Sequence, residues 1–206
     1  MKTIKVLFAL LALQFISIFV LESCCEDIRE YVFIDIQAQL SDNQGENPVL
    51  LDSLQNRVPA SAFAIEVKLE NDFWFSWLQN RHWQPFVPTA MATSCDEFYK
   101  TDAQIKKINV SVLGDFDNER RNNAEIPDYF KARNLLTDYD APSDLTSFID
   151  TYNKSLEGEK SSYLGNGFHL FLTQTPSIDS VFQFIITVDL QDDTQLIDTT
   201  RQIILY

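Results

Sequence analysis

Hydrophobic and polar positions alternate along much of the chain with a period of two residues. In 31–40 and 62–69 every second side chain is apolar, a pattern typical of a strand with one buried face. The same pattern predicts further strands at 108–112, 168–173, 181–190 and 196–206. Residues 41–58 are rich in Asn, Asp, Gln and Pro and are expected to form a long loop. Short strands separated by turn residues predict a mostly β fold, an antiparallel sandwich of about seven strands.

One segment has the period of an amphipathic helix instead. Its apolar side chains recur at spacings of three and four, at Leu145, Phe148, Ile149, Tyr152 and Leu156. Ser143 is the predicted N-cap of this helix, and Gly158 is its predicted end. A weaker helical turn is predicted at 128–136. Both helical segments fall within 115–165, which we interpret as a helical insertion or crossover between strands.

The N-terminus has the pattern of an export signal. Lys2 and Lys5 precede an apolar run over 6–21, as in the charged and apolar regions of a secretory signal. The sequence Leu21-Glu22-Ser23-Cys24 resembles the lipobox of bacterial lipoproteins, in which the Cys thiol receives the lipid; Glu22 departs from that pattern. We therefore expect 1–23 to be a lipoprotein signal peptide and 24–206 to be a single domain. The alternative is an uncleaved signal anchor.

The residues that follow argue against that alternative. Glu26, Asp27 and Glu30 are acidic, whereas a stop-transfer anchor would be followed by Lys or Arg. Over the whole chain the formal charge is −14, which repels phosphate backbones and makes nucleic acid an unlikely partner. The same charge repels anionic lipid headgroups, so attachment to a membrane must come from acyl chains.

Two further cysteines remain once Cys24 is assigned to lipid. An exported chain meets an oxidising compartment, so we predict a disulfide between Cys25 and Cys95. The alternative is a pair of free thiols.

All three tryptophans of the chain lie within ten residues of one another. Trp74, Trp77 and Trp83, with Arg81 and His82 beside them, are candidate ligand-binding residues, because exposed Trp rings stack on sugars and anchor protein interfaces. The alternative is that these rings fill the core, which is the commoner position of aromatic side chains.

No motif in the sequence indicates catalysis or a cofactor. Acidic side chains gather in 115–119 and again at Asp189, Asp192 and Asp193, but neither group has the spacing of a calcium loop, and solvated charge is the simpler interpretation. His82 and His169 are far apart, and the chain has no Cys-x-x-Cys pair, so we expect no metal site. His169 is expected to pack within its strand.

Together, the lipobox, the run Cys24-Cys25-Glu26-Asp27 and the final strand pair resemble uncharacterised exported lipoproteins of Bacteroidota with an Ig-like β-sandwich domain. The resemblance implies a cell outer membrane location, lipid-anchored and either periplasmic or surface-exposed. It implies no site, because that family has no assigned activity. We expect a non-enzymatic binding or structural module for a glycan or a protein. The alternatives are an envelope hydrolase and a fimbrial or assembly subunit whose last strand pairs with another chain.

Overall fold

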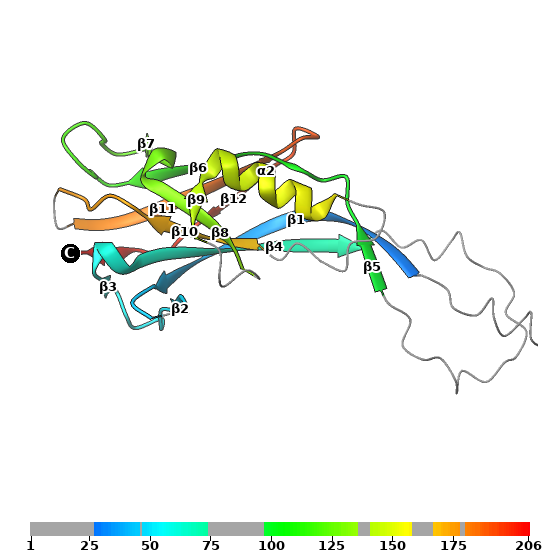
Figure 1. The fold of residues 1–206 in the computed structure, drawn as a ribbon. Helices are drawn as coiled ribbons and strands as arrows, with labels where there is room; N and C mark the ends of the chain where they lie inside the picture. The colour runs from blue at the N-terminus through cyan, green and yellow to red at the C-terminus, as the bar shows by residue number, and fades with distance from the viewer. Residues whose placement is uncertain (1–26, 46, 74–96, 136–140, 158–166, 178–179) are drawn as a thin grey trace, which may run out of the picture.

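The computed structural model describes residues 27–45, 47–73, 97–135, 141–157, 167–177 and 180–206. Within these ranges the protein is mostly β, with two sheets and one α-helix (Figure 1). The sheets contain antiparallel and parallel pairs. The described ranges include no helix that combines the length and the apolar content needed to span a membrane.

The first sheet has the order β2-β1-β4-β10-β8-β9, with β5 paired to the start of β1. Its strands are β1 (Asp27–Asp42), β2 (Val49–Leu50), β4 (Phe63–Phe73), β5 (Glu97–Lys100), β8 (Phe130–Asn134), β9 (Ser143–Asp144) and β10 (Gly167–Leu172). The longest pairing joins β1 to β4, antiparallel from Tyr31 opposite Phe73 to Asp42 opposite Phe63. By contrast, β5 runs parallel to β1.

The second sheet has the order β3-β13-β11-β6-β7, with β12 also paired to β11. Its strands are β3 (Arg57–Val58), β6 (Ile105–Leu113), β7 (Ala124–Glu125), β11 (Ser180–Leu190), β12 (Gln195–Thr199) and β13 (Ile203–Leu205). The sequence predicted 196–206 as one strand, but the chain breaks between β12 and β13. Thr200, buried at this break, donates its N–H to the Phe184 carbonyl and accepts the Phe184 N–H on its hydroxyl.

The core lies between the two sheets, in a sandwich-like arrangement. Alternate residues of β4 and β11 point into it, which confirms the two-residue period of both segments. The Phe63 ring of β4 lies 5.2 Å from the Phe184 ring of β11, and the Phe130 ring of β8 lies 5.9 Å from Phe184. Burying an apolar side chain of this size contributes about 1.5–3 kcal/mol, so these alternating positions supply much of the driving force for folding.

The alternation in β1 changes phase part-way along the strand. Tyr31 and Phe33 are buried in its first part and Ile36 and Leu40 in its second, while Val32 and Ile34 are exposed. A bulge between Phe33 and Asp35 inserts one extra residue, which turns the rest of the strand by one position. The sequence correctly predicted a strand here, but it wrongly placed Val32 and Ile34 on the same face as Ile36.

The predicted amphipathic helix is confirmed as α2 (Leu145–Leu156). Its apolar stripe is buried, and Phe148 packs against Phe168 of β10 at 5.3 Å. The N-cap is Asp144, not Ser143: the Asp144 carboxylate accepts the Ser147 N–H at 3.0 Å and the Ser147 hydroxyl at 2.8 Å. Carboxylates are preferred at this position because they satisfy unpaired N–H groups.

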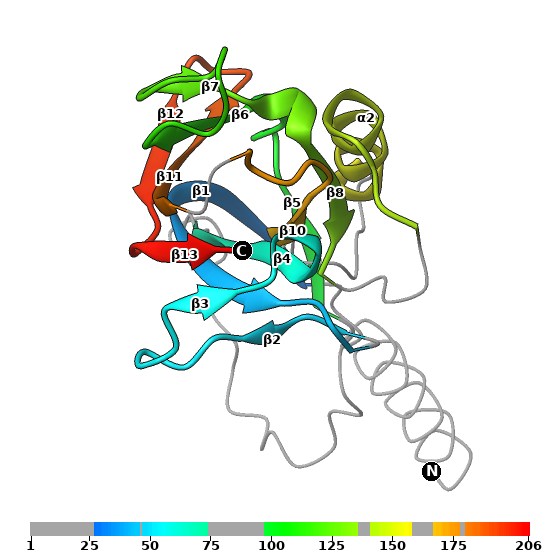
Figure 2. The same cartoon turned by 90° about the vertical axis from the view of Figure 1, so that its left-hand side faces the viewer.

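The helix covers the open side between the sheets. It contacts β8 of the first sheet and β6 of the second (Figure 2). Asn153, buried on α2, accepts the Ile105 N–H at 2.9 Å and donates to the Ile105 carbonyl at 2.8 Å. One side-chain amide thus pairs with β6 as a neighbouring strand would, which fixes the helix to the second sheet.

The stretch 115–165 contains strands as well as α2, and the helical turn predicted at 128–136 is wrong. A short 3-10 turn at Pro127–Tyr129 leads into β8. The residues after this turn form a strand because Phe130 and Ala132 bury alternate side chains and the segment pairs with β10. This stretch also supplies β7 and β9, so it contributes strands to both sheets. The loop expected at 41–58 contains β2 and β3, and the described ranges hold more than seven strands.

Candidate functional site

The site residues predicted from the sequence lie outside the part of the chain that the structure describes. They are the lipidation candidate, the two bridge candidates and the five ligand-binding candidates, namely Cys24, Cys25, Cys95, Trp74, Trp77, Arg81, His82 and Trp83. Their roles stay predictions. The structure does fix where the chain enters and leaves these segments.

Those entry and exit points meet at one end of the first sheet. Tyr31 lies opposite Phe73, the last residue of β4, and Asp27 lies opposite Glu97, the first residue of β5. Residues 74–96 therefore connect two strand ends that both adjoin the start of β1. Cys24 is three residues before that start. We call this region, made of residues 27–32, Phe73 and residues 97–102, the β1-start end.

A shallow hollow of about 130 Å³ lies at the β1-start end. It is lined by Glu30, Tyr31, Val32, Lys100, Thr101 and Asp102. Pockets that enclose small organic ligands usually measure about 300–1,000 Å³, so this one has room for a single side chain or a small polar group. Two carboxylates and one ammonium group line it, and Val32 and Ile34 expose 37% and 53% of their surface nearby on β1.

A row of ionisable side chains crosses the face of the first sheet that is turned away from the core. Glu66 of β4, His169 of β10 and Arg133 of β8 are direct cross-strand partners. His169 Nε2 lies 3.5 Å from the Glu66 carboxylate, and Lys68 Nζ lies 3.1 Å from the same group. The Arg133 guanidinium lies over the Phe171 ring, 5.1 Å from its centre.

This row explains the burial of two polar residues. His169 is 6% exposed, which confirms that it packs within its strand, and the Glu66 side chain is 12% exposed. Polar and ionisable groups withdrawn from water need partners, so the cross-strand register of β4, β10 and β8 is favoured when these residues stay opposite one another. We interpret these cross-strand contacts as interactions that help to specify the register of β4, β10 and β8.

Residues 33–201 match a family model described as a domain of unknown function (DUF5034). The chain belongs to the DUF5034 family. The matched region runs from the middle of β1 to the residue after Thr200. It contains α2 and every described strand except β13 and the first six residues of β1, and it begins just beyond residues 27–32 of the β1-start end. Comparison with curated proteins gave no match, and comparison with solved structures gave none either.

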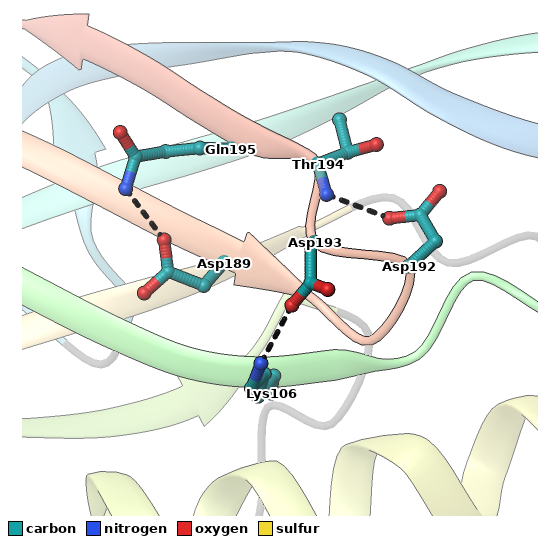
Figure 3. A network of polar contacts seen from close by, with 6 residues as sticks. All are labelled: Lys106, Asp189, Asp192, Asp193, Thr194 and Gln195. Carbon is teal, nitrogen blue, oxygen red and sulfur yellow. Dashed lines mark hydrogen bonds and ion pairs between the residues drawn. The ribbon is translucent and has the colours of Figure 1, made fainter.

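The second acidic group of this DUF5034 chain forms the turn between β11 and β12. Lys106 of β6 contacts the Asp193 carboxylate at 2.8 Å, the Gln195 amide donates to Asp189 at 2.7 Å, and the Thr194 N–H donates to Asp192 at 2.9 Å (Figure 3). Hydrogen bonding and charge from Lys106 lower the pKa of Asp193. Each carboxylate has a partner within the protein, so the turn is a structural feature on an exposed surface.

The first acidic group shapes the loop after β6 in the same way. Asp117 accepts the N–H groups of Glu119 and Arg120 at 2.8 and 2.6 Å and the Tyr129 hydroxyl at 3.1 Å. The Arg120 N–H is the main cause that lowers the pKa of this carboxyl. In the described ranges no three His, Cys, Asp or Glu residues are grouped so that they could hold a metal ion.

Sequence patterns did not reveal the hollow or the row of ionisable side chains. Both depend on register, which places Lys100 beside β1 and Arg133 beside His169 although these pairs are far apart in the chain. The one local signal was the strict alternation around Glu66, which places its side chain on the face of β4 opposite the core.

Proposed function

We propose that this DUF5034 protein is a lipid-anchored module of the cell outer membrane that binds a glycan or a protein, or has a structural role, without catalysing a reaction. The observation that carries the proposal is the lipobox-like sequence ending at Cys24, which only two residues separate from the first strand of the fold. A diacylglyceryl group on Cys24 supplies two acyl chains, which hold a protein stably at a membrane, whereas one chain does not.

The anchor is tested by intact mass and fractionation of the protein expressed in a lipoprotein-processing bacterium. We expect a mature N-terminus at Cys24 with the mass of the lipid added, and protein in the membrane fraction. The Cys24→Ser variant should lose both the added mass and the membrane association. A mature chain that begins elsewhere with an unmodified Cys24 would refute the anchor.

We also propose the disulfide between Cys25 and Cys95, and the strand register supports it. In the parallel pair of β1 and β5, Asp27 lies opposite Glu97, and in each following pair the two residues are the same number of positions apart in the sequence. Cys25 and Cys95 are separated by that same number of positions. Directly opposite residues on paired strands have the short Cα separation that a disulfide requires.

Alkylation before and after reduction tests the bridge. The oxidised, lipidated protein should take up no alkylating reagent at these two residues, and the reduced protein should take up two equivalents. Uptake without reduction would contradict the proposal.

The proposed ligand site is the aromatic group Trp74, Trp77 and Trp83, with Arg81 and His82. Its support is the fixed position of the flanking residues Phe73 and Glu97, which attach this segment to the β1-start end. Binding is tested on a glycan array and by pull-down from envelope extracts. Trp77→Ala and Trp83→Ala should abolish binding while the urea unfolding midpoint is kept. If the rings form a core instead, the same variants lose several kcal/mol of stability.

The finer fold assignment, an Ig-like sandwich, belongs to this proposal as well. Two facing sheets with mainly antiparallel neighbours support it. An experimental structure whose inner strands follow the Ig order would establish it, and a different strand order would refute it.

The fimbrial alternative finds less support in the strand pairing. It requires the last strand, predicted at 196–206, to pair with another chain. Of the two strands found there, β12 pairs with β11, and β13 pairs with β11 on one side and β3 on the other. The C-terminal residue continues this contact, since the Ala60 N–H donates to the Tyr206 carbonyl at 2.9 Å. Release of β13 would break both pairings.

A further inference from the structure

The first strand determines how far the folded domain can stand from a lipid on Cys24. Three residue steps separate Cys24 from Asp27, and an extended chain spans at most about 11 Å over three steps. The 16 residues of β1, at about 3.3 Å each, extend up to about 50 Å in the other direction. The tether is therefore short compared with the domain that it would hold.

The start of β1 is also fixed to the rest of the fold. β5 pairs with Asp27–Glu30, and the chain continues from β5 into β6 of the second sheet through 101–104. In that connection the Ala103 N–H donates to the Thr101 hydroxyl at 3.0 Å. The start of β1 can leave the sheet and lengthen the tether only if its pairing with β5 breaks.

We propose that the β1-start end faces the bilayer and that the opposite end of the sandwich is held away from it. This inference rests on the proposed lipid on Cys24. At the β1-start end, Lys100 offers an ammonium to lipid phosphates, and exposed Val32 offers apolar surface. The carboxylates of Glu30 and Asp102 at the same end oppose adsorption to anionic lipid, so the orientation comes from the short tether and not from the charge of this surface.

The opposite end then faces outward and carries exposed apolar side chains. β2 pairs with the last two residues of β1, and Val49 and Leu50 are 67% and 43% exposed. Leu54, just beyond β2, is 89% exposed. These residues lie at the end of β1 farthest from Cys24.

Fluorescence quenching in vesicles tests the orientation on the full lipidated protein. A thiol-reactive dye is placed at the β1-start end by Asp102→Cys and at the opposite end by Leu54→Cys. The protein is reconstituted in phosphatidylcholine vesicles that contain a lipid with a nitroxide on its headgroup. We expect strong quenching at position 102 and no quenching at position 54. Equal quenching at both positions, or stronger quenching at 54, would overturn the proposal.

Several controls separate the orientation from the anchor. The unsubstituted protein measures background labelling of Cys25 and Cys95, and Val32→Cys replaces Asp102→Cys if that variant does not fold. Ten Gly and Ser residues inserted between Cys24 and Cys25 add about 17 Å of flexible reach and should remove most of the difference between the two positions. A difference that persists undiminished would refute the role of the short tether. If the lipidated protein fails to stay with vesicles, or Cys24→Ser binds equally well, the anchor itself is wrong.

Discussion

At the scale of single residues, Gly167 is required by the contact between two strands. Its φ is +126°, a region that side chains rarely adopt, and a Cβ there would overlap the Val67 carbonyl oxygen of β4. Gly167→Ala should therefore lower the free energy of unfolding by at least about 2 kcal/mol, measured by urea denaturation. Gly45→Ala is the matched control, because the nearest atom to its Cβ is 3.6 Å away; an equal loss there would contradict the argument.

Asp117 gives the loop after β6 a dependence on pH. Hydrogen bonds hold the pKa of this carboxyl below its ordinary value of 3.8, so its contribution to stability is present above that value and is lost as pH falls through the lower folded pKa. Asp117→Asn should be less stable than the parent protein at pH 7, with a difference that shrinks in acid. Urea unfolding at pH 7 and pH 3 measures it. Glu119→Gln, exposed in the same loop, should change stability little at either pH.

At the scale of elements, the sequence and the structure assign different N-caps to α2, Ser143 and Asp144 respectively. Asp144→Ala should cost about 1 kcal/mol, because the Ser147 N–H loses its acceptor. Ser143→Ala, at the position predicted from the sequence, should change the unfolding free energy by less than about 0.5 kcal/mol. The reverse order of the two effects in urea denaturation would show that Ser143 is the cap.

Elements with a long internal period were predictable from the sequence, and elements defined by pairing were not. β4, β11 and α2 were predicted because their own side chains repeat at two or at three to four residues. β2, β3, β7 and β9 have two residues each, too few for any period, and exist because a longer strand lies beside them. β8 was predicted as a helical turn, and the only described helical residues beside it are the short 3-10 turn at Pro127–Tyr129. In β1, the bulge reversed the predicted faces of Val32 and Ile34.

The sequence predicted which residues belong to the candidate site, but it did not predict where in the fold they attach. The lipobox-like sequence and the aromatic segment are local features, so they were visible in the sequence. That the strands following these two segments in the chain, β1 and β5, lie side by side depends on the parallel pairing of Asp27 with Glu97, which no local pattern encodes. Polar groups whose partners are distant, such as Lys106 with Asp193, were missed for the same reason.

At the scale of the whole molecule, the proposed bridge would close a long loop. Cys25 and Cys95 enclose about 70 residues, for which chain entropy predicts a stabilisation of about 4 kcal/mol at most. Reduction of the purified protein should lower its thermal midpoint, and Cys95→Ser should have the lower midpoint without reductant. If the midpoint of the parent protein is unchanged by reductant, the bridge is absent or contributes nothing.

The pairing of β1 with β4 has a mechanical consequence for an anchored protein. A pull between a lipid on Cys24 and the Phe63 end of β4 would act along both strands. The hydrogen bonds from Tyr31–Phe73 to Asp42–Phe63 would then bear the load together, in shear, rather than break one after another. Under such tension the strand pair would resist extension and would transmit force along the first sheet to the bilayer.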